Sequence, residues 1–249
     1  MDSEIKTMAA QAVTPGTFLA QAVKTSAVPL GLVYGSDWLV GPDEEMGPTG
    51  TIVGFGGVEP EKKRRGPARI ADFLEIVPKE GIDLKVGDLL QSFRVLRKDR
   101  GLGTVLRPSG ILTVSAVTEA GVIAMVSSEL WPIYVGDQVR PAPEYTPRPL
   151  VYPVPVQSNV TASVIGFPEV RAIQSYGAEV FIDVGIPEGV SIGDIFRGSV
   201  TQPGPLFGME SARLQVILVE GNRSTARIIG VKNPVLSTGD LLRLIAKMQ

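Results

Sequence analysis

Cysteine and histidine are absent from this sequence of 249 residues. Without cysteine the chain has no disulfide, no thiolate nucleophile and no zinc–thiolate site. Without histidine it lacks the commonest general base, the commonest metal ligand and the side chain that titrates near neutral pH. These absences exclude Ser-His-Asp and Cys-His catalysis within the chain. We therefore expect no catalytic residues, no metal and no cofactor.

An excess of basic charge is lacking too. The 24 basic and 26 acidic residues give a net charge of −2 and a pI of about 5.4. A basic field is the usual mark of proteins that bind nucleic acid, so we expect no nucleic-acid partner. A hydrolase that uses two carboxylates stays open, because any two of the 26 acids can converge in a fold. Nothing in the sequence indicates which two.

Long apolar runs are missing as well. No stretch approaches the roughly 18 apolar residues that a membrane-spanning helix requires. The opening residues, MDSEIKTMAAQAV, contain acids and lack a basic segment followed by an apolar run. We therefore expect neither a transmembrane segment nor a signal peptide in this chain.

Glycine and proline, in contrast, are abundant, and glycines recur at matching places in two halves of the sequence. The 28 glycines and 20 prolines favour many short strands over long helices. Residues 51–55 and 163–167 read TIVGF and SVIGF, and each is followed by a loop, an alternating run, a Gly-Asp pair, three strands and a second Gly-Asp pair. Asp88 precedes Asp194 by 106 residues and Asp137 precedes Asp240 by 103, so length differences fall in loops. Such self-similarity indicates an internal duplication.

The fold class that we predict is all-β, with two tandem small β-barrel-like units related by this duplication. Five or six short strands a unit, with no long helical period, favour a closed or half-closed barrel. The first unit spans residues 48–140 and the second 159–249. A proline-rich linker, 141–158, is expected to be extended and stiff. Residues 1–47 form a partly ordered N-terminal extension.

Two elements are expected within that extension. Residues 17–24 are predicted as a short helix. Residues 30–34 (LGLVY) are predicted as a strand that leads into the first unit.

The Gly-Asp pairs are the strongest repeated signal: Gly87-Asp88, Gly136-Asp137, Gly193-Asp194 and Gly239-Asp240. Calcium needs six to eight converging oxygens, usually from closely spaced positions in one loop, whereas each of these aspartates stands alone before a strand. We interpret the pairs as structural turns, in which glycine supplies a positive φ and Asp bonds nearby backbone N–H groups.

Basic and aromatic side chains supply the other candidates. The basic run Lys62, Lys63, Arg64 and Arg65, with Arg69, is either a solvated loop or an anion contact. Trp38, Trp131 and Tyr176 are candidates for rim aromatics that stack on sugars, against the alternative that they pack in a core or rim. Trp131 lies in a loop beside Pro132 and is expected to plug the barrel.

The spacing of these features resembles two bacterial groups. Residues 180–185 (VFIDVG), 190–194 (VSIGD) and the closing Gly-Asp resemble the β-barrel region of LysM-containing peptidoglycan-binding envelope proteins and the C-terminal small barrel of the flagellar assembly protein FlgT. The similarity extends over residues 51–140 and covers about four-fifths of the chain. No LysM repeat is present, so no sugar-binding residue is carried over. The resemblance implies a periplasmic or cell-envelope location and a scaffolding role.

The leading hypothesis is a non-catalytic structural or interaction module of the bacterial cell envelope. It would recognise an envelope protein through barrel rims and the loops 58–69, 98–110 and 202–211. The alternative is a polysaccharide-binding module for peptidoglycan, and the carboxylate-dependent hydrolase comes third. A homo-oligomer stays open.

Overall fold

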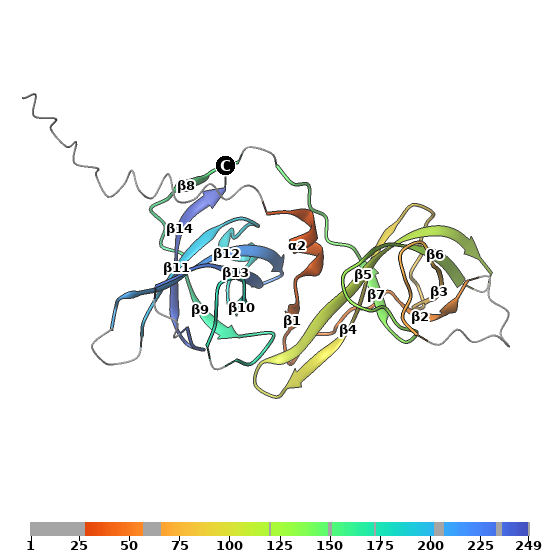
Figure 1. The fold of residues 1–249 in the computed structure, drawn as a ribbon, viewed down its shortest axis with the longest axis horizontal. Coiled ribbons are helices and arrows are strands. Elements are labelled where there is room, and N and C mark those ends of the chain that lie inside the picture. Colours follow the sequence, from red (N-terminus) through yellow and green to blue (C-terminus); the bar gives the residue numbers. More distant parts are fainter. Residues whose placement is uncertain are drawn as a thin grey trace, which may run out of the picture.

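Two barrels lie side by side along the long axis of the molecule, with a short helix and strand between them (Figure 1). The computed structural model describes seven stretches of the chain: 28–56, 66–119, 121–148, 151–171, 173–201, 207–232 and 236–248. Nearly all of the regular structure is antiparallel sheet. The all-β fold class predicted from the sequence is confirmed.

Barrel 1 contains six strands: β2 (Gly50–Phe55), β3 (Phe73–Pro78), β4 (Leu89–Asp99), β5 (Gly103–Thr118), β6 (Gly121–Glu129) and β7 (Gln138–Pro141). They pair in the order β2-β3-β6-β5-β4-β7. Strand β7 pairs again with β2, so the sheet closes on itself. Closure leaves these strands without a free edge.

Barrel 2 also contains six strands: β9 (Thr161–Gly166), β10 (Glu179–Ile182), β11 (Ile195–Ser199), β12 (Glu210–Glu220), β13 (Arg223–Val231) and β14 (Leu241–Met248). Their order, β9-β10-β13-β12-β11-β14 with β14 back on β9, is that of barrel 1 strand for strand. A 3-10 turn, Ile186–Glu188, follows β10. The predicted repeat is thus two barrels of one topology.

Each barrel has its own apolar core. In β3, Leu74 and Ile76 point into the barrel while Phe73, Glu75 and Val77 point outward, which is the two-residue alternation of a strand. The cores of both barrels consist of Val, Leu, Ile and Ala, with Phe55 in barrel 1 and Phe196 in barrel 2.

The four Gly-Asp pairs form one kind of turn. Each glycine has a φ between 91° and 100°. Each Asp side chain accepts a hydrogen bond, at 2.8 to 3.1 Å, from the backbone N–H three residues earlier. The backbone of each pair also bonds both ways with one residue of a neighbouring strand: Val114, Ile52, Val216 or Val164. The turns thereby fix where β4, β7, β11 and β14 enter the barrels.

A third turn of this kind precedes β3 and β10, and the sequence did not reveal it. In barrel 1 the pair is Ala71-Asp72, with Ala71 at a φ of 70° and the Asp72 side chain accepting from Arg69 N at 2.7 Å. In barrel 2 the pair is Gly177-Ala178. Each barrel has lost one half of the Gly-Asp signature at this turn, which is why the motif was not visible.

The segment between the barrels differs from the prediction. Residues 30–34 were predicted as a strand, but they lie in a helix, α2 (Leu30–Gly35). Pro29 precedes this helix, and Val33 is fully buried against residues of both barrels. The packing of Val33 against distant residues outweighs the β propensity of the segment. The predicted helix at 17–24 lies outside the described residues.

Strand β1 (Trp38–Val40) follows α2 and pairs with residues 104–106 at the beginning of β5. A mixed core joins β1 to both barrels, with Trp38 and Phe93 on one side and Ile217 on the other. The ring centroids of Trp38 and Phe93 lie 5.1 Å apart in an edge-on arrangement. Apolar packing therefore holds the two barrels together.

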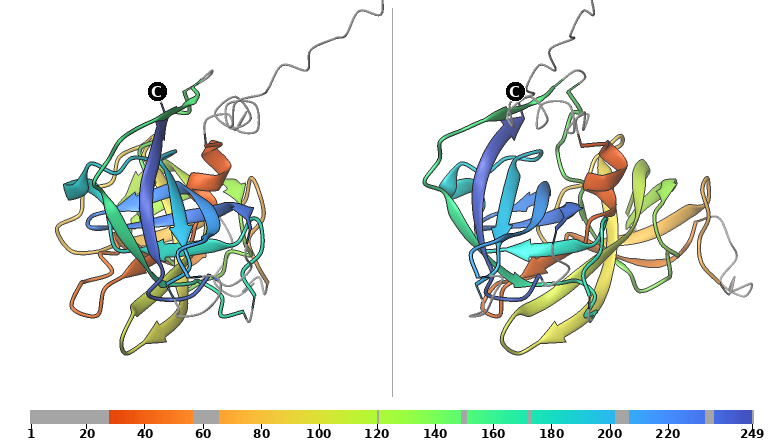
Figure 2. Two further views of the ribbon diagram at one scale, coloured as in Figure 1. Left: turned by 90° about the vertical axis from the view of Figure 1, so that its left-hand side faces the viewer. Right: turned by 60° about the vertical axis from the view of Figure 1, so that its left-hand side comes forward.

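Residues 98–110 were predicted as a loop, but most of them are strand. They form the end of the β4–β5 hairpin, which extends beyond barrel 1 and passes beside barrel 2 (Figure 2). The stretch predicted as a proline-rich linker contributes a strand, β8 (Pro153–Pro155), which pairs with β14. Proline is tolerated there because β8 lies at the edge of the sheet.

Candidate functional site

A cleft between the two barrels has a volume of about 360 Å³. Asp37, Arg107 and Trp131 line it from the side of barrel 1, and Glu169, Tyr176 and Glu179 line it from barrel 2. We call it the inter-barrel cleft. It contains both carboxylates and aromatic side chains, the two chemistries that the sequence left open.

Asp37 is fixed by Arg107 at the base of this cleft. Arg107 Nε donates to Asp37 Oδ1 at 3.0 Å, and Nη2 donates to Oδ2 at 2.7 Å. Burial raises the pKa of Asp37, and the hydrogen bond and charge of Arg107 act in the opposite direction. The same guanidinium bonds Glu169 at 3.2 Å. Both oxygens of Asp37 are therefore engaged.

Glu179 is the second acid of the cleft. Its Oε2 accepts a hydrogen bond from the backbone N–H of Asp37 at 3.0 Å. Burial, reinforced by the charge of Asp37, raises the pKa of Glu179 to about 8. Its carboxyl group is therefore mostly protonated at neutral pH. Thr225 Oγ1 donates to the Asp37 carbonyl at 2.8 Å, so this network ties β1 to barrel 2.

Two of the three predicted rim aromatics meet at this cleft. Trp131 is half-exposed and Tyr176 is exposed, and both line it. The guanidinium of Arg107 lies 4.7 Å from the centre of the Trp131 ring. Trp131 does not plug the barrel, because Ile133 occupies the core instead. Trp38 is buried beneath Arg140, so it is not a rim residue.

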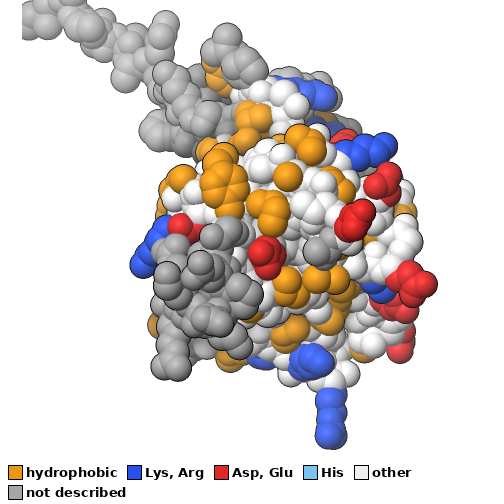
Figure 3. All heavy atoms as spheres, turned by 90° about the vertical axis from the view of Figure 1, so that its right-hand side faces the viewer, with side chains coloured by type: hydrophobic (Ala, Val, Ile, Leu, Met, Phe, Trp, Pro, Cys, Tyr) orange, Lys and Arg blue, Asp and Glu red, His pale blue; other side chains and the backbone are white. Residues whose placement is uncertain are grey.

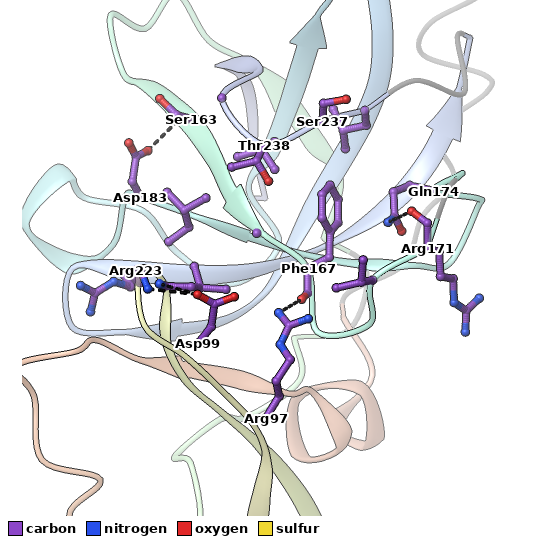
Figure 4. Close-up of a pocket in the computed structure, with 18 of the residues that line it drawn as sticks. Arg97, Asp99, Ser163, Phe167, Arg171, Gln174, Asp183, Arg223, Ser237 and Thr238 are labelled. Atoms are coloured by element: carbon purple, nitrogen blue, oxygen red, sulfur yellow. Dashed lines mark hydrogen bonds between the residues drawn. The ribbon is translucent and has the colours of Figure 1, made fainter.

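A larger groove, of about 1060 Å³, is lined by residues of the β4–β5 hairpin and of barrel 2 (Figure 4). Arg97 reaches across it, and its Nη2 donates to the Phe167 carbonyl at 3.0 Å. On the opposite wall Asp183 accepts from Ser163 N at 2.6 Å. The groove is wide and its polar groups are spread along both walls, so it presents no convergent set of catalytic groups.

The remaining candidates are distributed over the surface. Lys62, Lys63, Arg64 and Arg65 lie outside the described residues. Arg69 pairs with Glu129 at 2.8 Å, so its cation already has an anion within the chain. The four Gly-Asp aspartates lie in four separate turns, and within the described stretches no three acids cluster in a manner that could hold a metal ion. None of the helices in these stretches is long and apolar enough to cross a membrane.

The outer side of barrel 1 carries an apolar surface that we call the open face. It consists of outward side chains of β2, β3 and β6: Val53, Phe73, Val77, Ile123 and Met125. Val53, Phe73 and Val77 are 48%, 45% and 47% exposed. Figure 3 looks onto this end of the molecule, where hydrophobic side chains lie among scattered charges. Exposed apolar side chains grouped on one face of a folded protein often mark an interaction site.

Sequence reasoning named Trp131 and Tyr176 of the inter-barrel cleft but missed its acid pair, and it missed the open face. Asp37 and Glu179 lie 142 residues apart, and Arg107 stood in a stretch predicted as loop. The open face had a weak signal, since the outward positions of residues 73–77 already contain Phe73 and Val77. An apolar residue at an outward position becomes informative only when the strand direction is known.

In comparisons with known proteins, no family model matches this chain, and no curated protein or solved structure matches it either.

Proposed function

We propose that the chain is a non-catalytic interaction module of a bacterial cell envelope, and that it binds a protein partner through the open face of barrel 1. The observation that carries the proposal is the exposure of Val53, Phe73 and Val77 on adjacent strands. These strands belong to a closed barrel, so the surface is rigid before any partner arrives. A preformed apolar surface loses little conformational entropy on binding.

The inter-barrel cleft supports the non-catalytic part of the proposal. General acid–base chemistry needs carboxyl groups free to exchange protons with a substrate. Asp37 has both oxygens bound to Arg107, and Glu179 bonds the backbone of Asp37. The hydrogen bond between this acid pair connects the start of β1 to barrel 2, so we assign the pair a structural role.

The envelope location rests on the resemblance to LysM-associated barrels described above. It predicts that the partner is itself an envelope protein. Loops on a rigid barrel are a common place for such recognition.

A photoreactive phenylalanine analogue placed at residue 73 tests the proposal in an envelope fraction. We expect a protein adduct from residue 73. The matched control has the analogue at Ile186, which is also exposed but lies on barrel 2, and we expect no such adduct from it. Equal labelling from both positions, or no protein adduct from residue 73, would contradict the proposal.

A second candidate function is saccharide binding in the inter-barrel cleft. It is favoured by Trp131 and Tyr176, which line one cleft beside charged hydrogen-bonding groups. Aromatic faces with adjacent polar groups suit the apolar faces and hydroxyls of a sugar. Titration of the protein with soluble peptidoglycan fragments, followed by calorimetry, tests it.

In that titration, the alternative predicts heat of binding that Trp131→Ala abolishes. Tyr134→Ala is the control, because Tyr134 is exposed but is not among the residues lining the cleft. No heat with the wild-type protein would end this alternative.

A further inference from the structure

The two barrels can be aligned residue by residue. Ile52 and Val164 each bond to the last Gly-Asp turn of their barrel. Two residues later the register shifts in the same way in both barrels, so that Gly54 lies opposite Glu75 and Gly166 lies opposite Phe181. The open face on β2, β3 and β6 therefore corresponds to the face of β9, β10 and β13 in barrel 2.

The corresponding face of barrel 2 is covered from within the chain. Val105, near the end of the β4–β5 hairpin, packs with Phe181 in a small buried cluster. Leu102, at the tip, lies so close to Gly166 that a Cβ there would be 2.7 Å from Leu102 Cδ2. One hairpin of barrel 1 thus rests on a defined face of barrel 2, an arrangement that we call the inner joint.

The outward residues of the two faces differ in kind. Where barrel 2 has Glu179 and Arg227, barrel 1 has Phe73 and Met125. At these two positions the open face has apolar groups where barrel 2 has charged ones, whereas at a third position it has Glu75 where barrel 2 has Phe181, which packs against the hairpin.

At one of two matched positions, the hairpin of barrel 2 also has an apolar residue where the hairpin of barrel 1 has a charged one. Val200 pairs with Met209 as Arg94 pairs with Arg107, so Met209 corresponds to Arg107 and Phe207 to Val105. Phe207 and Met209 are 66% and 55% exposed. Two exposed apolar residues, Phe207 and Met209, thus lie on barrel 2, and an apolar face lies exposed on barrel 1 of the same chain.

We propose that barrel 2 of one copy docks, through Phe207 and Met209, on the open face of barrel 1 of a second copy. This inference rests on the proposed function of the open face and names its partner as the same chain. The contact repeats the inner joint between molecules, with Met209 against Phe73 in place of Arg107 beside Glu179. The two surfaces are different, so the contact is head-to-tail and extends into a filament or closes into a ring.

The proposed contact between two copies, which we call the outer contact, is weaker than the inner joint. Strand β1 adds to the inner joint by pairing with β5, while the strand in the equivalent position of the chain, β8, pairs with β14. The outer contact therefore lacks this extra layer and buries less surface. Glu75 also lies in the open face where barrel 2 has Phe181, and its desolvation opposes docking. Assembly is accordingly expected to depend on concentration.

Sedimentation of the purified full chain, in a series reaching about 1 mM, tests the proposal. The average mass should rise with concentration beyond that of a dimer, and Glu75→Leu should shift this rise to lower concentration. Phe73→Lys and Met209→Glu should each remain monomeric. Ile186→Lys, at a more exposed site outside both surfaces, should assemble like the wild type.

The decisive experiment mixes the two variants that should not assemble on their own. Phe73→Lys keeps its barrel 2 hairpin and Met209→Glu keeps its open face, so the mixture retains one intact contact and should form a complex that stops at two chains. A wild-type protein that stays monomeric overturns the inference, as does a mixture that stays monomeric while the wild type associates. If the chain is monomeric yet residue 73 cross-links to another envelope protein, this inference fails and the proposed function stands.

Discussion

Barrels 1 and 2 share a strand order, a bulge and three turns each, yet they differ in what one face does. In barrel 2 the face of β9, β10 and β13 is covered by a hairpin and holds Glu179 and Arg227 beside buried Phe181. In barrel 1 the matching face is exposed and holds Phe73 and Met125. A duplicated frame can therefore keep its core and turns while the outward residues of three strands decide whether a face is used within the chain or outside it.

The largest expected effect separates the covered face from the open one. Phe181→Ala should destabilise barrel 2 by about 3–5 kcal/mol, because it leaves a cavity in the inner joint. Phe73→Ala, on the matching strand of barrel 1, should change stability by less than about 1 kcal/mol. Urea unfolding of both variants measures the difference, and equal losses would show that the two faces are not in different environments.

The next effect concerns protonation of the covered face. Glu179 keeps its proton in the folded protein up to a pKa of about 8, whereas it ionises near 4.5 in the unfolded chain. The folded state then holds a proton that the unfolded state has released, so its stability falls as the pH rises from 4.5 to 8.

Glu179→Gln should remove this pH dependence and stabilise the protein at pH 8 by more than about 1.4 kcal/mol, the equivalent of one pKa unit. Thermal unfolding at pH 5 and pH 8 provides the measurement. A wild-type protein that gains stability over this range would contradict the burial of a neutral acid.

Equivalent turns offer a smaller test. Asp88→Ala should cost about 1 kcal/mol, because it removes one hydrogen bond to Lys85 N. Asp194→Ala should cost more, since Asp194 is buried and also bonds Lys247 Nζ at 3.2 Å. Melting temperatures of the two variants decide it. Unchanged melting with loss of partner binding would mean that these aspartates are ligands and not turn devices.

The smallest effect comes from the turn where the barrels differ. Ala71 has a φ of 70°, which glycine adopts more easily, and barrel 2 has Gly177 there. Ala71→Gly should stabilise barrel 1 by about 0.5–1 kcal/mol, and Gly177→Ala should destabilise barrel 2 by a similar amount. Opposite signs in urea unfolding would confirm the equivalence, and equal signs would refute it.

Local patterns predicted much of this architecture. Strand alternation, loop spacing and the Gly-Asp pairs sufficed for two barrels with matching strands, because each signal concerns residues close in sequence. Residues 30–34 were assigned wrongly, since a single buried side chain, Val33, decides their helix through contacts with distant strands. The turn at Ala71 was not predicted, because an alanine in the sequence gives no sign that its φ is positive.

The site was beyond sequence reasoning for a further reason. Whether Trp131 plugs a barrel or lines a cleft depends on the position of barrel 2, which no local pattern encodes. The acid pair likewise exists only because β1 docks on β10. Docking between units is a property of outward side chains, and these look alike whether they face water or a neighbour.

Equivalent faces are open in barrel 1 and covered in barrel 2. Because the chain has no cysteine, Val53→Cys and Ile165→Cys each introduce a unique thiol at matched positions. The rate of thiol modification in dilute solution tests the claim directly. We expect slower labelling at residue 165, which is partly buried against the hairpin, than at residue 53, which is 48% exposed. Equal rates at the two positions would contradict it.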